Sequence, residues 1–94
     1  MITRVVKMSF EADRIELFKK IFAETKGGIR AFPGCNEVNL FQHATDPSVF
    51  FTISKWNSEA DLDHYRNSEF FAKVWNMTRQ GFKAKPEAWT LQEC

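Results

Sequence analysis

The alternation of apolar and polar residues at the start of the chain predicts a strand over residues 2–10. One face of this segment is mostly apolar, and it carries Ile2, Arg4, Val6, Met8 and Phe10. The other face carries Thr3, Val5, Lys7 and Ser9. A period of two residues is typical of a strand that packs one face against a core. We therefore expect the first face to meet the core.

A helical repeat of apolar residues follows this strand. The side chains that stay in phase are Ile15, Phe18, Phe22 and Ile29. Asp13, followed three residues later by Glu16, has the form of a capping box, so we expect Asp13 to begin the helix.

Two glycines interrupt the end of this helical repeat. Gly27 and Gly28 each disfavour a helix by ~1 kcal/mol relative to alanine. Because Ile29 stays in phase with Phe22, we expect a loosened last turn rather than an early stop. The tripeptide at 32–34, Phe-Pro-Gly, then ends the helix.

Two further strands are predicted around the turn signal Asp46-Pro47-Ser48. The first covers about residues 35–44 and the second covers residues 49–56. The second strand is apolar on both faces, with Val49, Phe51 and Ile53 on one side and Phe50 and Trp56 on the other. A strand of this kind belongs inside a sheet that is covered on both faces.

The last third of the chain predicts two helices and a short strand. Ser58 and Asp61 have capping-box spacing for a helix over 58–66, and Ser68 begins a second helix over 68–82. The stripe of the second helix is Phe71, Trp75, Thr78 and Phe82. A strand at 87–92 completes the chain.

The predicted element order is β-α-β-β-α-β, which indicates an α+β, ferredoxin-like fold in a single domain of residues 1–94. Two helices would cover one face of a four-stranded antiparallel sheet, and the chain supplies no third layer for the other face. Ten phenylalanines and three tryptophans are also a large apolar content for 94 residues. We therefore expect a homodimer in which two sheets cover each other.

Charge and cysteine content exclude several classes of function. Thirteen basic and twelve acidic residues are interspersed and give a net charge of +1, so we expect no nucleic-acid partner. Cys35 and Cys94 form no disulfide framework and no metal-ligand spacing, so we expect free thiols and no metal. No apolar run suits a signal peptide or a membrane span, which predicts a cytoplasmic protein with no membrane partner.

The element order and one motif together resemble the antibiotic-biosynthesis monooxygenase family. The motif is W-x-S…L-x-x-Y-x-x-S-x-x-F, and its positions here are Trp56, Ser58, Leu62, Tyr65, Ser68 and Phe71. The Phe-Pro-Gly-Cys turn before the second strand is similar to the family's as well. The resemblance covers essentially the whole chain. It implies a dimeric α/β barrel, formed from two ferredoxin-like sheets.

The resemblance also implies a range of activities. Characterised members include cofactor-independent monooxygenases that act on quinols and polyketide-like aromatics. Related members degrade haem or isomerise a phosphorylated sugar derivative. Members that degrade haem carry a ligating histidine where this chain has Trp75, and an indole N–H cannot ligate iron. We therefore expect no specific haem binding and no cofactor.

Six residues are candidates for a site that oxidises a small aromatic substrate with dioxygen. Tyr65 stands where many quinol-oxidising members carry a histidine, and we expect its hydroxyl to donate a hydrogen bond to a substrate phenolate. His43 is the candidate for proton transfer near neutral pH. The candidates for substrate binding are Trp56, Trp75, Phe71 and Asn39.

The same residues have a structural interpretation. The aromatics are large units of buried area and would be ordinary core, and a lone strand histidine beside a turn is commonly exposed. Under that interpretation the chain is a small-ligand-binding or structural dimer without catalysis.

Overall fold

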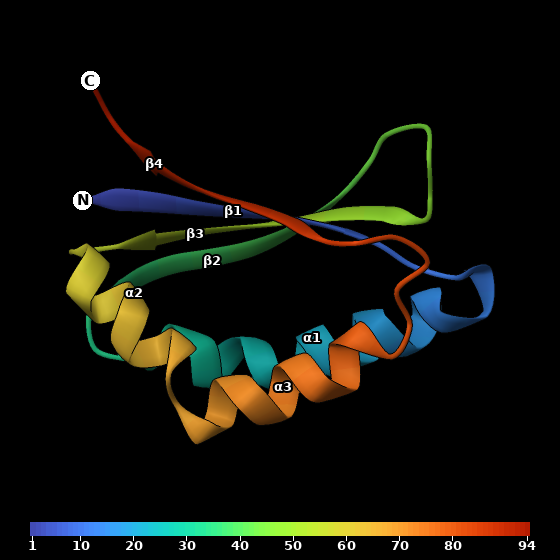
Figure 1. The fold of residues 1–94 in the computed structure, drawn as a ribbon, viewed down its shortest axis with the longest axis horizontal. Coiled ribbons are helices and arrows are strands. Elements are labelled where there is room, and N and C mark those ends of the chain that lie inside the picture. Colours follow the sequence, from blue (N-terminus) through green and yellow to red (C-terminus); the bar gives the residue numbers. More distant parts are fainter.

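The computed structural model describes residues 1–94 and has the predicted order of elements. Its strands and helices are β1 (Ile2–Ser9), α1 (Ile15–Arg30), β2 (Cys35–Gln42), β3 (Val49–Trp56), α2 (Glu59–Arg66), α3 (Glu69–Arg79) and β4 (Glu87–Gln92). The strands form one antiparallel sheet in the order β2-β3-β1-β4. Figure 1 shows all three helices on one side of this sheet. The ferredoxin-like α+β prediction is confirmed.

The pairing register decides which side chains face the helices. Arg4 of β1 lies between Ser54 of β3 and Thr90 of β4, so these three residues form one row. Neighbouring residues along a strand alternate between faces. Val5 therefore faces away from the helices, in a row with Ile53 and Trp89.

The buried core has two parts, which lie toward opposite ends of the sheet. One part surrounds Trp56, which is 0% exposed, and includes Ile29, Cys35, Val38, Leu62 and Tyr65. The other surrounds Phe10 and includes Met8, Phe18 and Phe50. The predicted core face of the first strand is confirmed, because Met8 and Phe10 are both buried.

Helix boundaries differ from the sequence predictions at two points. Asp13 does not cap α1: residues 12–14 form a short 3₁₀ turn, and α1 begins at Ile15 without a side-chain cap. The helix α3 ends at Arg79 rather than at Phe82, since Phe82 pairs with Phe10 in an isolated β-bridge. Tertiary contacts with Phe10 therefore override the local helical pattern.

Two glycines occupy positions that other residues would not fit. Helix α1 continues through Gly27 and Gly28 to Arg30, in agreement with the phase of Ile29. A Cβ on Gly28 would lie 2.5 Å from Cζ of Phe70, so this glycine lets α1 and α3 approach closely. Gly34 has φ +84°, a left-handed conformation that glycine adopts without strain.

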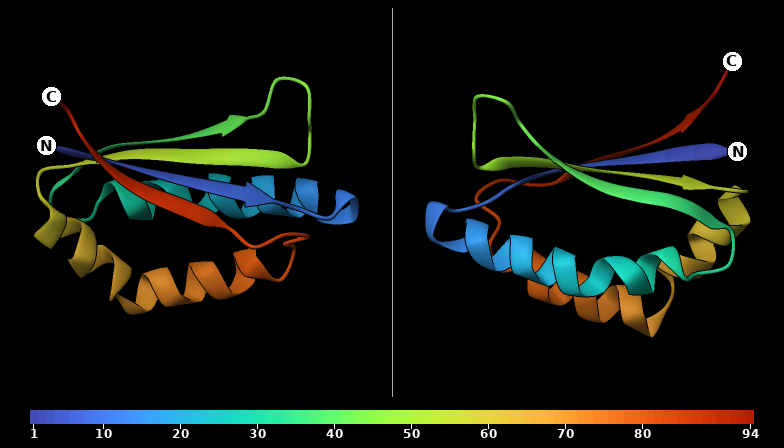
Figure 2. Two further views of the ribbon diagram at one scale, coloured as in Figure 1. Left: turned by 45° about the horizontal axis from the view of Figure 1, so that its top comes forward. Right: turned by 180° about the vertical axis from the view of Figure 1, so that it is seen from behind.

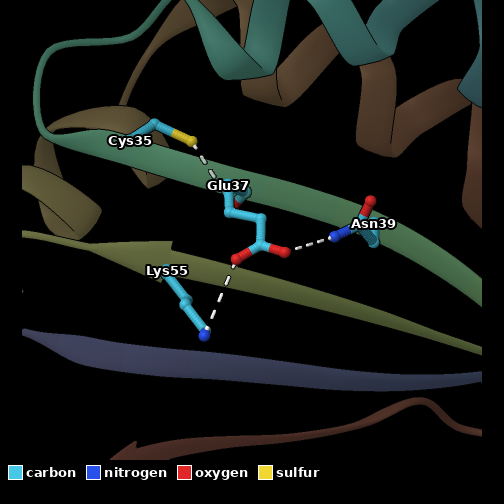
Figure 3. Close-up of polar contacts among 4 residues, drawn as sticks. All are labelled: Cys35, Glu37, Asn39 and Lys55. Carbon is cyan, nitrogen blue, oxygen red and sulfur yellow. Dashed lines mark hydrogen bonds and ion pairs between the residues drawn. The ribbon is translucent and has the colours of Figure 1, made fainter.

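The face of the sheet opposite the helices is bare in the single chain, as both views in Figure 2 show. Phe41, Trp89 and Leu91 are 51%, 43% and 50% exposed. Figure 3 shows polar contacts on the same sheet: Glu37 pairs with Lys55 at 3.6 Å and accepts a hydrogen bond from Asn39 at 2.8 Å. We call this surface the open face. No helix in the chain is long and apolar enough to cross a membrane.

Candidate functional site

A cavity of about 350 Å³ lies between the sheet and the helices. Its walls are mostly apolar. The sheet contributes Val6, Met8 and Thr52, α1 contributes Phe22 and Ile29, and α2 and α3 contribute Tyr65, Phe71, Val74 and Trp75. Cavities of this size and character are typical of sites for small ligands. The candidate site is therefore inside the single chain and not on the open face.

Local capping places Tyr65 at one end of this cavity. Ser58 Oγ accepts a hydrogen bond from the backbone N–H of Asp61 at 3.2 Å, which begins α2. Ser68 Oγ accepts from the N–H of Phe71 at 3.1 Å and donates to the carbonyl oxygen of Tyr65 at 2.6 Å. Ser58 thus fixes the start of α2, and Ser68 holds the junction between α2 and α3, just after Tyr65.

Three aromatic rings fix the orientation of Tyr65. Its ring stacks on Trp56 with the centroids 5.2 Å apart and the planes at 23°. Phe71 and Phe32 approach it edge-on, each with a centroid distance of 5.1 Å. Aromatic contacts of this kind add to the free energy of area burial. The side chain is thus held rigidly and is only 9% exposed.

The hydroxyl of Tyr65 makes no hydrogen bond within the chain. Every fully buried side-chain nitrogen or oxygen of the chain has a partner, so this hydroxyl is not fully buried. The hydroxyl oxygen is therefore accessible to solvent, and the Tyr65 side chain lines the cavity. Burial, together with the nearby Cys35 thiol, raises the pKa of Tyr65 above its ordinary value of 10.0. At neutral pH the hydroxyl is protonated and available as a hydrogen-bond donor.

The two predicted tryptophans lie differently. Trp75 lines the cavity and stacks with Phe71 at 5.9 Å. Trp56 lies behind Tyr65, and its Nε1 donates to Ser54 Oγ at 2.9 Å. Because that N–H is already used, Trp56 supports the cavity wall through Tyr65 and has no free donor for a ligand.

His43 and Asn39 lie away from the cavity. The ring Nδ1 of His43 accepts hydrogen bonds from the backbone N–H groups of Thr45 and Asp46, at 3.2 and 3.1 Å. This residue stands beside the start of β3, whereas Trp56 and α2 are at its far end (Figure 1). The eight residues of β3 span about 23 Å. Asn39 lies on the open face beside Glu37 (Figure 3). Within one chain, the structure does not bring either residue to Tyr65.

Two arginines at the cavity were not predicted from the sequence. Arg4 projects from β1, and Arg66 ends α2, and both line the cavity. Burial and the neighbouring charge of Arg66 lower the pKa of Arg4, while the Asp63 carboxylate opposes this effect. The available signal was that Arg4 is the one charged residue on the core face of its strand.

The residue types of a metal site are not gathered anywhere in the chain. No three His, Cys, Asp or Glu side chains lie close enough together to hold an ion. Cys35 is buried, its Sγ lies 3.8 Å from the carbonyl oxygen of Glu37, and burial raises the pKa of its thiol. It is therefore a protonated, packed thiol at neutral pH.

Comparison with known sequences matches residues 1–75 to a family described as antibiotic biosynthesis monooxygenase. The matched range contains Trp56, Tyr65, Phe71 and Trp75 and ends before β4. No curated protein matches the chain.

Solved structures share the fold of the whole chain. A crystal structure of an antibiotic biosynthesis monooxygenase has a TM-score of 0.93 at 19% identity, covering 100% of this chain and 99% of its own. A conserved protein from Methanosarcina mazei Go1 has a TM-score of 0.93 at 17% identity, with 100% and 94% covered. PA3566 from Pseudomonas aeruginosa has a TM-score of 0.86 at 19% identity, with 99% and 93% covered. At these identities the likeness establishes the fold alone.

Proposed function

Because this chain belongs to the antibiotic biosynthesis monooxygenase family, we propose that it is a cofactor-independent monooxygenase. Its substrate is a small quinol or polyketide-like aromatic, which it oxidises with dioxygen in the cavity beside Tyr65. The observation that carries the proposal is the Tyr65 hydroxyl: it is protonated, it has no partner in the chain, and its rigidly held side chain lines an apolar cavity.

The chemistry requires the substrate to supply every electron. A phenol that has lost its proton is electron-rich enough to reduce dioxygen, and the oxygen adduct on its carbon then breaks its O–O bond. For oxidation of a ring CH₂ to a carbonyl, one oxygen atom stays on carbon and the other leaves as water. Four electrons leave the substrate and none is needed from a cofactor.

The residues around the cavity would assist this reaction in three ways. Phe71 and Trp75 hold the ring and exclude water, which strengthens every electrostatic interaction at the reacting oxygen. The Tyr65 hydroxyl donates a hydrogen bond to the phenolate oxygen as its charge moves. The cation of Arg4 favours the deprotonated substrate, whose proton passes to water at the cavity opening.

We also propose that two chains pair through the open face to form a dimeric α/β barrel. The exposed rings of Phe41 and Trp89 support this proposal, because so much apolar surface is costly in a single chain. The surface also carries two ion pairs, Lys55–Glu37 and Lys7–Glu87. Fixed charges of this kind favour one register of a partner over others.

A binding role without catalysis is the second candidate, and one observation favours it. No imidazole lines the cavity. The single acidic residue at its edge is Glu87, whose carboxylate pairs with Lys7 at 3.8 Å. A site that only binds an aromatic ligand needs no general base. A monooxygenase without a general base must rely on a substrate that loses its proton to water.

Oxygen consumption distinguishes the two candidates. The purified protein is mixed with a panel of hydroquinones and anthrone-type phenols, and uptake of labelled dioxygen into the product is measured by mass spectrometry. We expect one labelled oxygen atom per product molecule. Binding of these compounds with no oxygen uptake above the protein-free rate would favour the binding role.

A matched pair of variants locates the reaction. Val74 lines the cavity on α3, and Lys73 beside it is exposed. Val74→Phe fills the cavity and should lower kcat/KM, whereas Lys73→Phe adds the same ring outside and should leave it unchanged. Equal rates in the two variants would place the reaction elsewhere.

A further inference from the structure

We propose that the cavity selects aromatic compounds that carry a carboxylate, which Arg4 and Arg66 bind at its opening. This inference deepens the proposed function by naming a substrate class. That these compounds are oxidised rests on the proposed function, whereas that they bind does not.

Arg4 is a partly buried cation that makes no ion pair, although the charge of Asp63 acts on it from a longer distance. None of the ion pairs in the chain involves Arg4. Its one side-chain hydrogen bond runs from Nη1 to Thr90 Oγ1, at 2.9 Å. A guanidinium has five N–H donors in a planar fork, so most of the donors of Arg4 are free. Partly buried charges are normally paired, and an anionic ligand would supply the missing partner.

Arg66 adds a second positive charge to the same opening. It lies directly after Tyr65 in the chain and lines the cavity together with Arg4. Its one ion pair is with Asp63, at 4.0 Å, and both side chains are well exposed, at 46% and 64%. An exposed pair at this distance is weak. Arg4, Arg66 and Asp63 together still carry a net positive charge, and Glu87 at the cavity edge is paired with Lys7.

The geometry joins these charges to an apolar interior. Arg4 comes from the sheet and Arg66 from α2, so the two cations approach from the two layers that enclose the cavity. Beyond them the walls are aromatic and aliphatic, with Phe71 and Trp75 on α3. A ligand that fits both parts has an apolar ring with an anionic group at one end. A planar carboxylate matches the fork of a guanidinium with two parallel hydrogen bonds.

Calorimetric titration with a pair of unreactive probes tests the inference without turnover. Naphthoate and its uncharged analogue naphthamide have nearly the same shape. We expect naphthoate to bind the parent protein about tenfold more tightly, which is the typical effect of one charge-assisted hydrogen bond. The preference should shrink as sodium chloride is added, because the opening is partly exposed. Equal affinities for the two probes would overturn the inference.

Variants assign the preference to Arg4. Arg4→Gln should weaken naphthoate binding about tenfold and leave naphthamide binding within about twofold, since the uncharged probe makes no ion pair with Arg4. Arg4→Lys should recover part of the preference. Arg79→Gln removes the same charge from the end of α3, outside the cavity, and should change neither affinity. Circular dichroism confirms that each variant is folded, and an Arg4→Gln protein that keeps the full preference for naphthoate would contradict the assignment.

The outcome separates the two proposals. A carboxylate preference that depends on Arg4, with no oxygen uptake for any phenol, would uphold the anion site and refute the monooxygenase. Oxygen uptake with hydroquinones, together with no preference for their carboxylated analogues, would uphold the monooxygenase and refute the anion site.

Discussion

Gly28 of α1 faces the ring of Phe70, and a Cβ at this glycine would lie 2.5 Å from Cζ of that ring. Gly27, one residue earlier in the same helix, has no neighbouring atom within 4 Å of such a Cβ. The two glycines therefore have different reasons for their presence. Gly28 permits a close approach of two helices, whereas Gly27 only leaves the helix less stable than alanine would.

Alanine substitutions at these positions should have opposite effects on the free energy of unfolding. Gly27→Ala should stabilise the protein by about 0.5–1 kcal/mol, because alanine loses less backbone entropy in a helix. Gly28→Ala should destabilise it by about 1 kcal/mol, because Phe70 must move. Urea unfolding of both variants measures the difference, and equal stabilisation would mean that the Phe70 ring moves without cost.

Tyr65→Phe should separate catalysis from stability. The hydroxyl makes no hydrogen bond in the chain, so its removal should change the free energy of unfolding by less than about 1 kcal/mol. Removing a donor to the reacting oxygen typically costs ~3 kcal/mol of transition-state stabilisation, which is about a hundredfold in kcat. Steady-state oxygen uptake and urea unfolding of the same sample give both numbers. An unchanged kcat would make Tyr65 an ordinary core residue.

Alkaline pH should destabilise the parent more than Tyr65→Phe. Burial, with a further contribution from Cys35, raises the pKa of Tyr65 in the folded chain above its ordinary value of 10.0. As the pH rises past that ordinary value, the unfolded chain releases the proton and the folded chain keeps it. The free energy of unfolding then falls by about 1.4 kcal/mol per pH unit. Below the ordinary value this contribution is fully present.

Urea unfolding across the alkaline range checks this slope. The difference between parent and variant cancels the titration of the lysines, which both proteins share. A constant difference from neutral to strongly alkaline pH would show that Tyr65 ionises as easily in the folded chain as in the unfolded chain.

Light scattering should detect a dimer with twice the 11.0 kDa mass of the chain at micromolar concentration. Trp89→Glu places a charge on the open face, on its edge strand β4, and should give the single-chain mass. Met77→Glu is the control, because Met77 is similarly exposed, at 39%, but lies on α3. A parent protein with the single-chain mass would refute pairing through the open face.

The element order could be predicted because its signals are local. Alternation in β1, the apolar run of β3 and the caps at Ser58 and Ser68 each depend on a few neighbouring residues. The predicted cap at Asp13 was wrong, because residues 12–14 form a 3₁₀ turn and α1 begins at Ile15. The local pattern also did not show that Phe10 stacks on Phe18, at 4.2 Å. Contacts between distant segments are not visible in a local pattern.

The candidate site was predicted only in part, for the same reason. Tyr65, Phe71 and Trp75 come from adjoining helices, and the structure brings them to one cavity. Asn39 and His43 alternate correctly along the second strand, but alternation alone does not say which face meets the helices. Arg4 lines the cavity, and its hydrogen-bond partner Thr90 lies eighty-six residues later in the chain, on the paired strand β4. No local pattern shows such a contact.

The stacking of Tyr65 on Trp56 gives the chain a built-in optical signal. The protein has a single tyrosine, and its ring lies 5.2 Å from an indole. A tyrosine this close to an indole passes its excitation energy to it, so the folded chain should emit tryptophan fluorescence alone. Tyrosine emission should appear only when the chain unfolds. Loss of the packing around the site can thus be followed in the unmodified protein, without a dye or a label.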